Sequence, residues 1–144
     1  MPKAYSSGVV PASADSVWEV VRPFDGLPAW HPAIESSEIT SGSAGEVGAV
    51  RRLTLGDGGV VVERLVALDG ASRSTTYCFA GENPFSVERY LSTIQVCEVS
   101  DTGEAFVQWW AEFDADAANA AELTATFSDD VYGVGIAALK ERFA

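Results

Sequence analysis

A single acidic residue interrupts an otherwise apolar row in residues 60–68, a segment with the alternating pattern of a β-strand. Residues two apart on a strand share a face, so Glu63 lies among the apolar side chains of that face. On the expected strand 48–55, Arg51 and Leu53 fall on the same side of the sheet. A carboxylate and a guanidinium on neighbouring inner faces either pair or leave a buried charge at a cost of several kcal/mol. The residues that share the face of Glu63 are Val61, Leu65 and Ala67.

The pair formed by Glu63 and Arg51 has two interpretations that the residues alone leave open. In the structural interpretation, the two side chains form a buried ion pair that joins neighbouring strands. In the functional one, they form a polar anchor for the carbonyl, hydroxyl or carboxylate of a bound molecule. If the protein catalyses a reaction, Glu63 is the expected general base, because burial raises the pKa of a carboxyl group.

His31 is the only histidine of the chain and lies between Trp30 and Pro32. An imidazole changes charge near neutral pH, so His31 is a candidate anion contact or acid–base group. A lone histidine in such a position is also common as a surface or capping residue. Both interpretations stay open on the sequence alone.

The sequence contains few residues or motifs that are typical of metal or organic-cofactor sites. One histidine and two separated cysteines do not make an ordinary zinc or iron site, although carboxylates alone can hold a metal. The glycines of residues 56–59 lie in an expected hairpin and lack the following helix that a phosphate-binding loop needs. We therefore expect no metal and no cofactor.

Six large aromatic side chains fall at inward positions of the expected elements. Strand alternation also places Ser92 on the inner face, two residues from Tyr90. Aromatic sets of this kind are usually core. A glycine inside a helix costs about 1 kcal/mol relative to alanine, and the missing side chain at Gly135 leaves room on the inner stripe of the last helix, which favours a cavity. The six aromatic residues are Tyr77, Phe79, Tyr90, Trp109, Phe113 and Phe127.

Turn-forming clusters and apolar periodicity predict the elements that position these residues. A short strand is expected at residues 5–10, and Ser13 or Asp15 caps a short helix that stops before Pro23. A second short helix or a tight connector covers residues 24–32. Hairpins then join strands expected at residues 34–41, 48–55, 60–68, 73–80, 87–99 and 105–114.

Apolar residues recur at three- and four-residue spacing in the last part of the chain, which predicts one long helix over residues 117–142. The sheet has one apolar face and the helix one apolar stripe, so each covers the other. The expected fold class is α+β, with a curved seven-stranded antiparallel sheet wrapped around this helix and two short helices after the first strand. The expected stripe contains Phe127, Val131, Val134, Gly135, Ala138 and Leu139.

Composition and charge limit the partners of the protein. Its 144 residues, 47% of them hydrophobic, have the usual size of one domain, expected to span residues 1–144. The net charge of -12 disfavours nucleic acid and anionic membrane surfaces. No segment is apolar enough to insert into a membrane and no secretory signal is visible, so a cytoplasmic location is expected. Cys78 and Cys97 lie too far apart on consecutive strands to pair, and both are expected to be free thiols.

Several motifs resemble those of one known superfamily. Pro-Phe-Asp-Gly-Leu-Pro-Ala-Trp-His-Pro occupies residues 23–32, Val-Gly-Ala-Val-Arg-Arg-Leu residues 47–53, and Glu-Arg-Leu residues 63–65. Together with Trp109, Phe113 and the order of elements, these motifs resemble the START-like, helix-grip (SRPBCC) superfamily. Within it, the chain most resembles the small bacterial polyketide cyclase/dehydrase-like proteins. The resemblance covers nearly the whole chain and implies the helix-grip fold, whose members bind lipids, hormones and polyketides.

The plant abscisic-acid receptors of that superfamily are similar enough to imply individual pocket positions. Their lysine that meets a ligand carboxylate falls on His31, a glutamate on Glu63 and a pocket tyrosine on Tyr90. Their gate loop is replaced by Leu-Gly-Asp-Gly-Gly at residues 55–59, so hormone-gated phosphatase binding is not implied. The other pocket positions that the resemblance implies are Tyr77, Phe79, Phe127 and Val131.

Taken together, the residues and the resemblance predict a protein that binds a small hydrophobic, oxygen-bearing molecule, polyketide- or lipid-like, in an internal cavity. Catalysis of its cyclisation, dehydration or isomerisation, a carrier or sensor role, and a protein-interaction role all stay open, as does the oligomeric state, with a homodimer among the options. The candidate catalytic residues are Glu63 as the base, with Tyr90 and His31 to polarise or protonate a carbonyl. The candidate ligand-binding residues are Trp30, Arg51, Leu53, Tyr77, Phe79, Ser92, Trp109, Phe113, Phe127, Val131 and Gly135.

Overall fold

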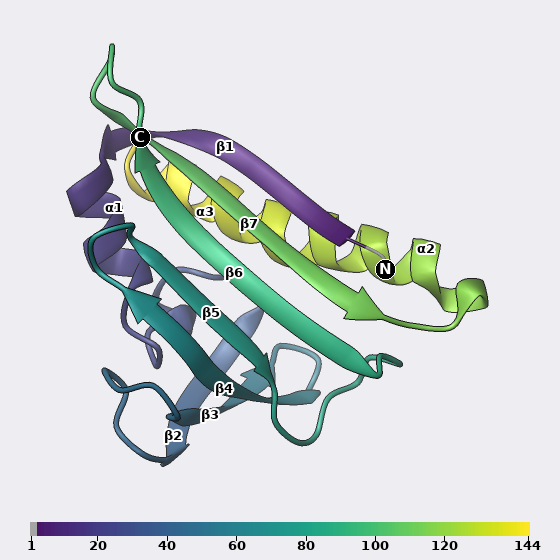
Figure 1. Ribbon diagram of the computed structural model, residues 1–144. Helices are drawn as coiled ribbons and strands as arrows, with labels where there is room; N and C mark the ends of the chain where they lie inside the picture. Colours follow the sequence, from purple (N-terminus) through teal and green to yellow (C-terminus); the bar gives the residue numbers. More distant parts are fainter. Residues whose placement is uncertain (1–2) are drawn as a thin grey trace.

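The computed structural model describes residues 3–144 and contains one antiparallel sheet of seven strands in the order β1-β7-β6-β5-β4-β3-β2 (Figure 1). Successive strands from β2 to β7 are neighbours, which is the expected meander, and β1 closes the sheet beside β7. The expected meander and fold class are therefore confirmed, and the structure adds the pairing of β1 with β7. The strands are β1 Lys3–Ser13, β2 Ile34–Ser41, β3 Val50–Leu55, β4 Val60–Asp69, β5 Ser74–Phe79, β6 Arg89–Glu98 and β7 Glu104–Asp114.

The first helix, α1 (Ala14–Val21), begins at Ser13, whose side chain accepts a hydrogen bond of 3.1 Å from the backbone N–H of Ser16. This bond satisfies one of the free N–H groups of the first turn, so Ser13 is the cap and Asp15 is not. The helix ends before Pro23, as expected. The connector that follows contains one 3-10 turn, η1 (Leu27–Ala29).

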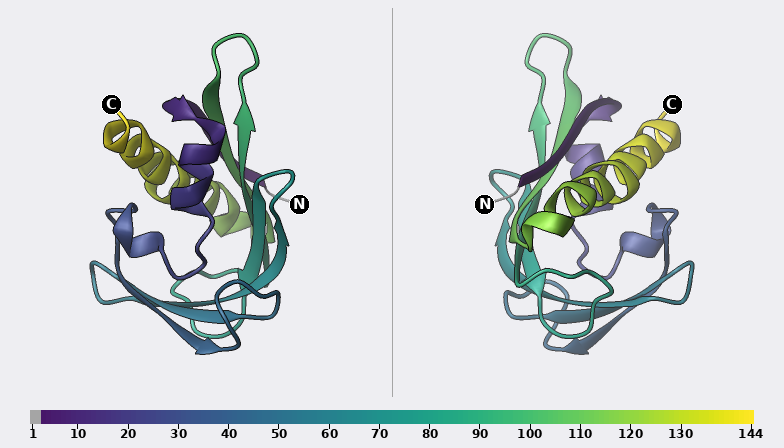
Figure 2. Two further views of the ribbon diagram at one scale, coloured as in Figure 1. Left: turned by 90° about the vertical axis from the view of Figure 1, so that its left-hand side faces the viewer. Right: turned by 90° about the vertical axis from the view of Figure 1, so that its right-hand side faces the viewer.

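The C-terminal helix runs from residue 117 to residue 142 without a break and lies against the concave face of the sheet. Figure 2 shows the sheet bent so that β2, β3 and β4 turn under the helix, while β1, β6 and β7 stand beside it. The helix packs chiefly on β1 and β7. It has three parts: α2 (Ala117–Ala125), the π-helical segment η2 (Thr126–Gly133) and α3 (Val134–Arg142).

The π-helical segment changes which side chains face the sheet. The buried residues of η2 are Phe127 and Tyr132, five positions apart, and the buried stripe continues with Ile136 and Leu139. The expected stripe was wrong for Val134 and Ala138, which are only half-buried and do not pack against the core, whereas Val131 does. The reason is that a π-helical turn holds more residues than an α-helical one, which moves the inner face along the chain.

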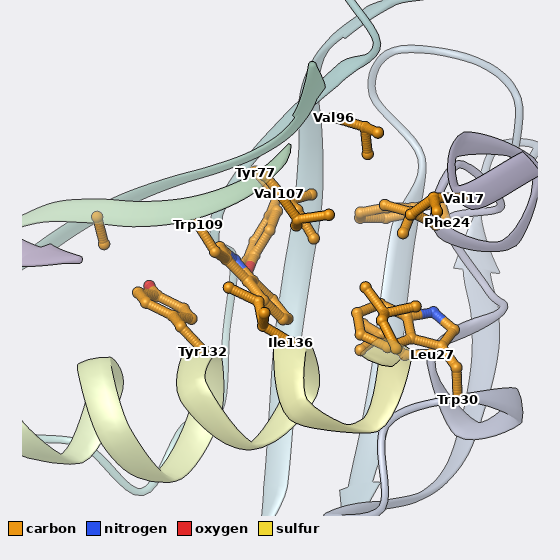
Figure 3. Packing of buried hydrophobic residues seen from close by; sticks show 14 of the residues in the cluster. Val17, Phe24, Leu27, Trp30, Tyr77, Val96, Val107, Trp109, Tyr132 and Ile136 are labelled. Carbon is orange, nitrogen blue, oxygen red and sulfur yellow. The ribbon is translucent and has the colours of Figure 1, made fainter. Parts of the chain in front are cut away.

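A cluster of buried hydrophobic side chains fills the space between the sheet and the end of the helix that contains α3 (Figure 3). Tyr132 and Ile136 point from the helix toward Trp109, while Phe24 and Trp30 belong to the group supplied by the N-terminal segments. Cys78 and Cys97 carry free thiols and are half-buried, which confirms that they do not pair. Within residues 3–144, no helix has the length and apolar character that crossing a membrane requires.

Candidate functional site

A cavity of about 360 Å³ lies between the concave face of the sheet and the segment η2. Its volume falls in the range of roughly 300–1,000 Å³ that small-molecule sites occupy. The predicted site residues that line it are His31, Arg51, Leu53, Glu63, Tyr77, Phe79, Tyr90, Trp109, Phe127 and Val131. The other predicted residues, Trp30, Ser92, Phe113 and Gly135, are not part of its lining.

Arg51 and Glu63 form a buried ion pair in the wall of this cavity. They lie directly opposite each other on β3 and β4, because the strand register pairs them. Arg51 donates to Oε1 of Glu63 from Nε at 2.9 Å and from Nη2 at 2.7 Å, and its Nη1 donates to the carbonyl of Phe24 at 2.8 Å. The guanidinium also lies over the rings of Phe24 and Tyr77, with its central carbon 4.1 and 4.8 Å from their centroids. These contacts fix the position of the guanidinium.

Glu63 keeps one oxygen for other partners. Both bonds from Arg51 end on Oε1, and Oε2 accepts no hydrogen bond from any residue in the described part of the chain. The residue is 5% exposed and lines the cavity. Burial raises the pKa of Glu63, and the charge of Arg51 offsets part of that rise. The ion pair thus joins two strands and also presents a carboxylate oxygen to the cavity.

His31 is buried and has both ring nitrogens engaged. Its Nε2 lies 2.7 Å from the carbonyl of Val131, and its Nδ1 lies 3.2 Å from the backbone N–H of Ala33. A carbonyl only accepts and an N–H only donates, so Nε2 carries the proton and Nδ1 is the acceptor. Burial lowers the pKa of His31, although its bond to Val131 opposes this. His31 is 1% exposed, which excludes a surface position, and neither nitrogen is free to meet a ligand.

A network of hydroxyl groups joins the cavity wall to the residues behind it, since Tyr77 and Tyr90 line the cavity whereas Ser92 and Tyr132 do not. The hydroxyls of Tyr90 and Tyr132 share a short hydrogen bond, and Tyr132 also lies 3.1 Å from Oγ of Ser92. The indole N–H of Trp109 donates to Oγ of Ser92 at 3.2 Å and to the hydroxyl of Tyr77 at 3.0 Å. Burial raises the pKa of all three tyrosines, so their hydroxyls stay protonated near neutral pH. They therefore act as hydrogen-bond partners and not as bases.

Tyr132 is the member of this network that sequence reasoning missed. A three- or four-residue step from Phe127 leads to Asp130 or Val131, and only the five-residue step through η2 brings Tyr132 to the sheet. Ser92 was correctly placed on the inner face, but its hydroxyl bonds to Tyr132, to Trp109 and to the carbonyl of Trp110 instead of lining the cavity. Its position supports the wall from behind.

Gly135 does not enlarge the cavity, contrary to expectation. A Cβ at this position would lie 2.8 Å from Cδ2 of His31 and 2.8 Å from Cζ3 of Trp109, so the two rings fill the space. Trp30 packs behind them, with its ring centroid 5.8 Å from that of Trp109. Phe113 likewise packs against Phe127, at 5.2 Å between centroids. Gly135 is a point of close approach between the helix and the rings.

The rim of the cavity comes from segments whose role the sequence did not reveal. Asp57 lies in the loop between β3 and β4, Phe85 in the loop between β5 and β6, and Thr126 and Asp130 in η2. Both aspartates are exposed. Phe85 packs on Phe127 with 4.9 Å between ring centroids. Loop residues carry no periodicity, so only the three-dimensional structure shows that they meet.

Residues 3–144 contain no cluster of three or more His, Cys, Asp or Glu side chains that is able to hold a metal ion. The polar groups of the cavity are instead a carboxylate oxygen and the hydroxyls of Tyr77 and Tyr90, set among apolar and aromatic side chains. Such a composition is typical of sites that take up an apolar molecule and orient it through a few hydrogen bonds.

Comparisons with known proteins agree with this geometry. The family model described as "Polyketide cyclase / dehydrase and lipid transport" matches residues 1–144. The protein XoxI from Bacillus cereus has 33% identity and a TM-score of 0.89, over 99% of this chain and 96% of that one. A protein from Thermobifida fusca has 32% identity and a TM-score of 0.89, over 99% and 93%. The major latex-like protein 151 of Panax ginseng, at 18% identity and a TM-score of 0.82 over 98% and 96%, shares the fold. The comparison with curated proteins finds no match.

Proposed function

Because the chain belongs to the polyketide cyclase/dehydrase and lipid transport family, we propose that it binds a small hydrophobic, oxygen-bearing molecule, polyketide- or lipid-like, in the cavity beneath η2. The observation that carries this proposal is the free Oε2 of Glu63 in a wall that is otherwise apolar and aromatic. The apolar body of the ligand supplies most of the affinity by leaving water, and the carboxylate oxygen fixes its orientation.

Aromatic side chains give the cavity a preference for flat or cyclic molecules. Phe79 and Tyr90 stack with 4.0 Å between centroids and 5° between planes, and Phe127 lies 4.9 Å from the ring of Tyr90. Rings held against one another lose little freedom when a ligand arrives, so the site is largely preformed. A rigid, flat-walled cavity suits polycyclic or folded polyketide-like molecules.

Catalysis is a second candidate function, and the position of Glu63 favours it. A carboxylate whose pKa is raised by burial is a suitable general base for a proton next to a carbonyl. In such a reaction Oε2 of Glu63 takes the proton, and the electron pair moves onto the carbonyl oxygen. The protonated hydroxyls of Tyr77 and Tyr90 are the cavity groups suited to hydrogen-bond that oxygen. His31 is left out of this scheme, since both its nitrogens are engaged.

Native mass spectrometry of the freshly purified protein tests the binding proposal, because a co-purified molecule adds its mass to the folded chain. Two variants on one strand supply the control. Val61→Phe fills the cavity and Val66→Phe adds the same ring on the exposed outer face of β4. The added mass should be lost in the first variant and kept in the second. An adduct that survives Val61→Phe would contradict binding in this cavity.

The same sample separates an enzyme from a carrier or sensor. Incubation of the recovered molecule with protein stripped of ligand, followed by mass and chromatographic comparison, shows whether the molecule changes. Cyclisation and isomerisation alter retention without altering mass, and dehydration removes one water. A molecule recovered unchanged would favour the carrier or sensor role.

A further inference from the structure

The cavity offers no free positive charge to a ligand. Among its lining residues in the described chain, only Arg51 and His31 carry nitrogen groups that can be cationic. The charge of Arg51 is compensated by the carboxylate of Glu63, and each of its three guanidinium nitrogens donates a hydrogen bond to Glu63 or to the carbonyl of Phe24. The guanidinium also packs on the rings of Phe24 and Tyr77. His31 uses both of its nitrogens within the protein. A ligand carboxylate or phosphate therefore finds no counter-charge in this wall.

Negative charge, in contrast, occurs both inside the cavity and at its rim. Oε2 of Glu63 faces the interior without a hydrogen-bond partner in residues 3–144. Asp57 and Asp130 stand exposed at the rim, on two different elements, and the whole chain carries a net charge of -12. Oδ1 of Asp57 accepts the N–H of Gly59 at 2.8 Å, which holds this carboxylate in its turn. A molecule that enters passes two carboxylates and ends beside a third.

We propose that the cavity selects a neutral or cationic ligand that donates a hydrogen bond from a hydroxyl or amine to Oε2 of Glu63, and that it rejects carboxylates and phosphates. This inference rests on the proposed function, since it names the chemical class of the molecule that the cavity binds. It also separates this protein from relatives whose pocket lysine meets a ligand acid, because the matching residue, His31, has no nitrogen to offer. An unpaired anion in such a site is strongly disfavoured.

Four probes that share one apolar body test the selection: 2-naphthol, 2-(aminomethyl)naphthalene, 2-methoxynaphthalene and 2-naphthoate. Their dissociation constants are measured by isothermal titration calorimetry at pH 7.5 with ligand-free protein. The alcohol and the amine each donate a hydrogen bond, the ether only accepts, and the naphthoate carries a negative charge. We expect the alcohol and the amine to bind roughly tenfold or more tightly than the ether, and the naphthoate to bind most weakly.

Two sets of variants show which charges produce the order. The double variant Asp57→Asn with Asp130→Asn removes two negative charges from the rim, so it should bring the dissociation constants of amine and naphthoate closer together. The dissociation constant of naphthol, which is uncharged at pH 7.5, should change far less. Glu63→Gln removes the partner of Arg51 and should strengthen naphthoate binding while it weakens amine binding. The rim variant keeps the test informative if Glu63→Gln fails to fold.

The outcomes separate this inference from the proposal beneath it. Naphthoate binding as tightly as naphthol, with both lost in Val61→Phe, would overturn the selection and leave cavity binding intact. Binding by none of the four probes would count against an apolar-ligand site, and the inference would fall with it. Support for both the binding proposal and the selection requires two results. The alcohol and the amine bind most tightly, the ether less tightly and the naphthoate most weakly. In Glu63→Gln, the naphthoate binds more tightly than the amine.

Discussion

The space between the sheet and the C-terminal helix is filled at one end and hollow at the other, although aromatic side chains line both. At the filled end, Gly135 of α3 lets the rings of His31 and Trp109 come into contact with the helix backbone. At the hollow end, η2 presents Phe127 and Val131 to the cavity. The helix backbone therefore meets aromatic rings directly at one end, whereas side chains of η2 border an open space at the other.

The hollow end stays open because its wall is braced from within. The Arg51 guanidinium packs on two rings and ties β3 to β4, and Phe79 and Tyr90 stack flat against each other. Side chains that satisfy one another along the wall have little to gain by turning into the void. At the filled end, rings pack directly on the helix, and Trp109 stacks on Tyr132.

The largest effect is expected from Glu63→Gln at the hollow end. Loss of the carboxylate leaves Arg51 buried without its partner, which should lower the free energy of unfolding by roughly 3–5 kcal/mol. Chemical denaturation measures the loss, and Glu38→Gln, at an exposed position of β2, is the control with an expected change near zero. A small loss of stability combined with a large loss of ligand affinity would show that the pair serves the ligand and not the sheet.

A smaller effect is expected from Gly135→Ala at the filled end. The added Cβ lies 2.8 Å from each of two rings, and overpacking of this kind costs about 1–3 kcal/mol. The alanine also gains about 1 kcal/mol in helix propensity. The cost exceeds this gain only when the rings cannot move. We expect a net loss of stability in thermal denaturation. Gly45→Ala, with nothing within 4 Å of its added Cβ, is the matched control. A stabilised Gly135→Ala would mean that the filled end is looser than the structure shows.

Residues on regular elements were largely predictable, and this includes the central pair of the site. A two-residue period is enough to place Glu63 and Arg51 on one face, and the register then sets them opposite each other. Tyr132 was missed because it lies five residues after Phe127, and three- or four-residue steps counted from Phe127 lead to Asp130 or Val131. The hydrogen bond from His31 to Val131 joins residues 100 positions apart, and the rim residues Phe85 and Asp130 meet only through the fold. Contacts of this kind leave no pattern in the local sequence.

The pH dependence of stability tests the burial of His31 at the junction of the two ends. Burial lowers the pKa of His31, so the unfolded chain takes up a proton near pH 6.5 while the folded protein does so only at lower pH. The free energy of unfolding should therefore fall as pH drops below about 6.5, with a limiting slope of about 1.4 kcal/mol per pH unit.

The variant His31→Gln isolates this contribution. Glu63 acts with the opposite sign, because its raised pKa makes stability fall as pH rises above its unfolded value of about 4.5. Both proteins contain Glu63, so subtracting their free energies of unfolding at each pH cancels its contribution. The remaining pH dependence is that of His31. Equal pH profiles for the two proteins would show that His31 is accessible to protons in the folded state.

The smallest effect concerns a polar defect in the filled end. Thr75 of β5 is buried, and its hydroxyl has no hydrogen-bond partner in residues 3–144. The indole N–H of Trp30 also lacks a hydrogen-bond partner among these residues. Both residues border a void of about 20 Å³. Thr75→Val keeps the β-branched shape and removes an unsatisfied hydroxyl, so it should raise the free energy of unfolding by about 1 kcal/mol. Thr76→Val, on the opposite face of the same strand, removes a hydroxyl that lies 2.9 Å from that of Thr93 and should not stabilise the protein.

The void beside Thr75 and Trp30 holds one water at most. If a water bridges Thr75 and Trp30 in solution, Thr75→Val removes one of its partners and destabilises the protein instead. That result would show that the filled end holds water at its centre. The two ends would then differ in the size of the space they enclose, and not in whether water enters it.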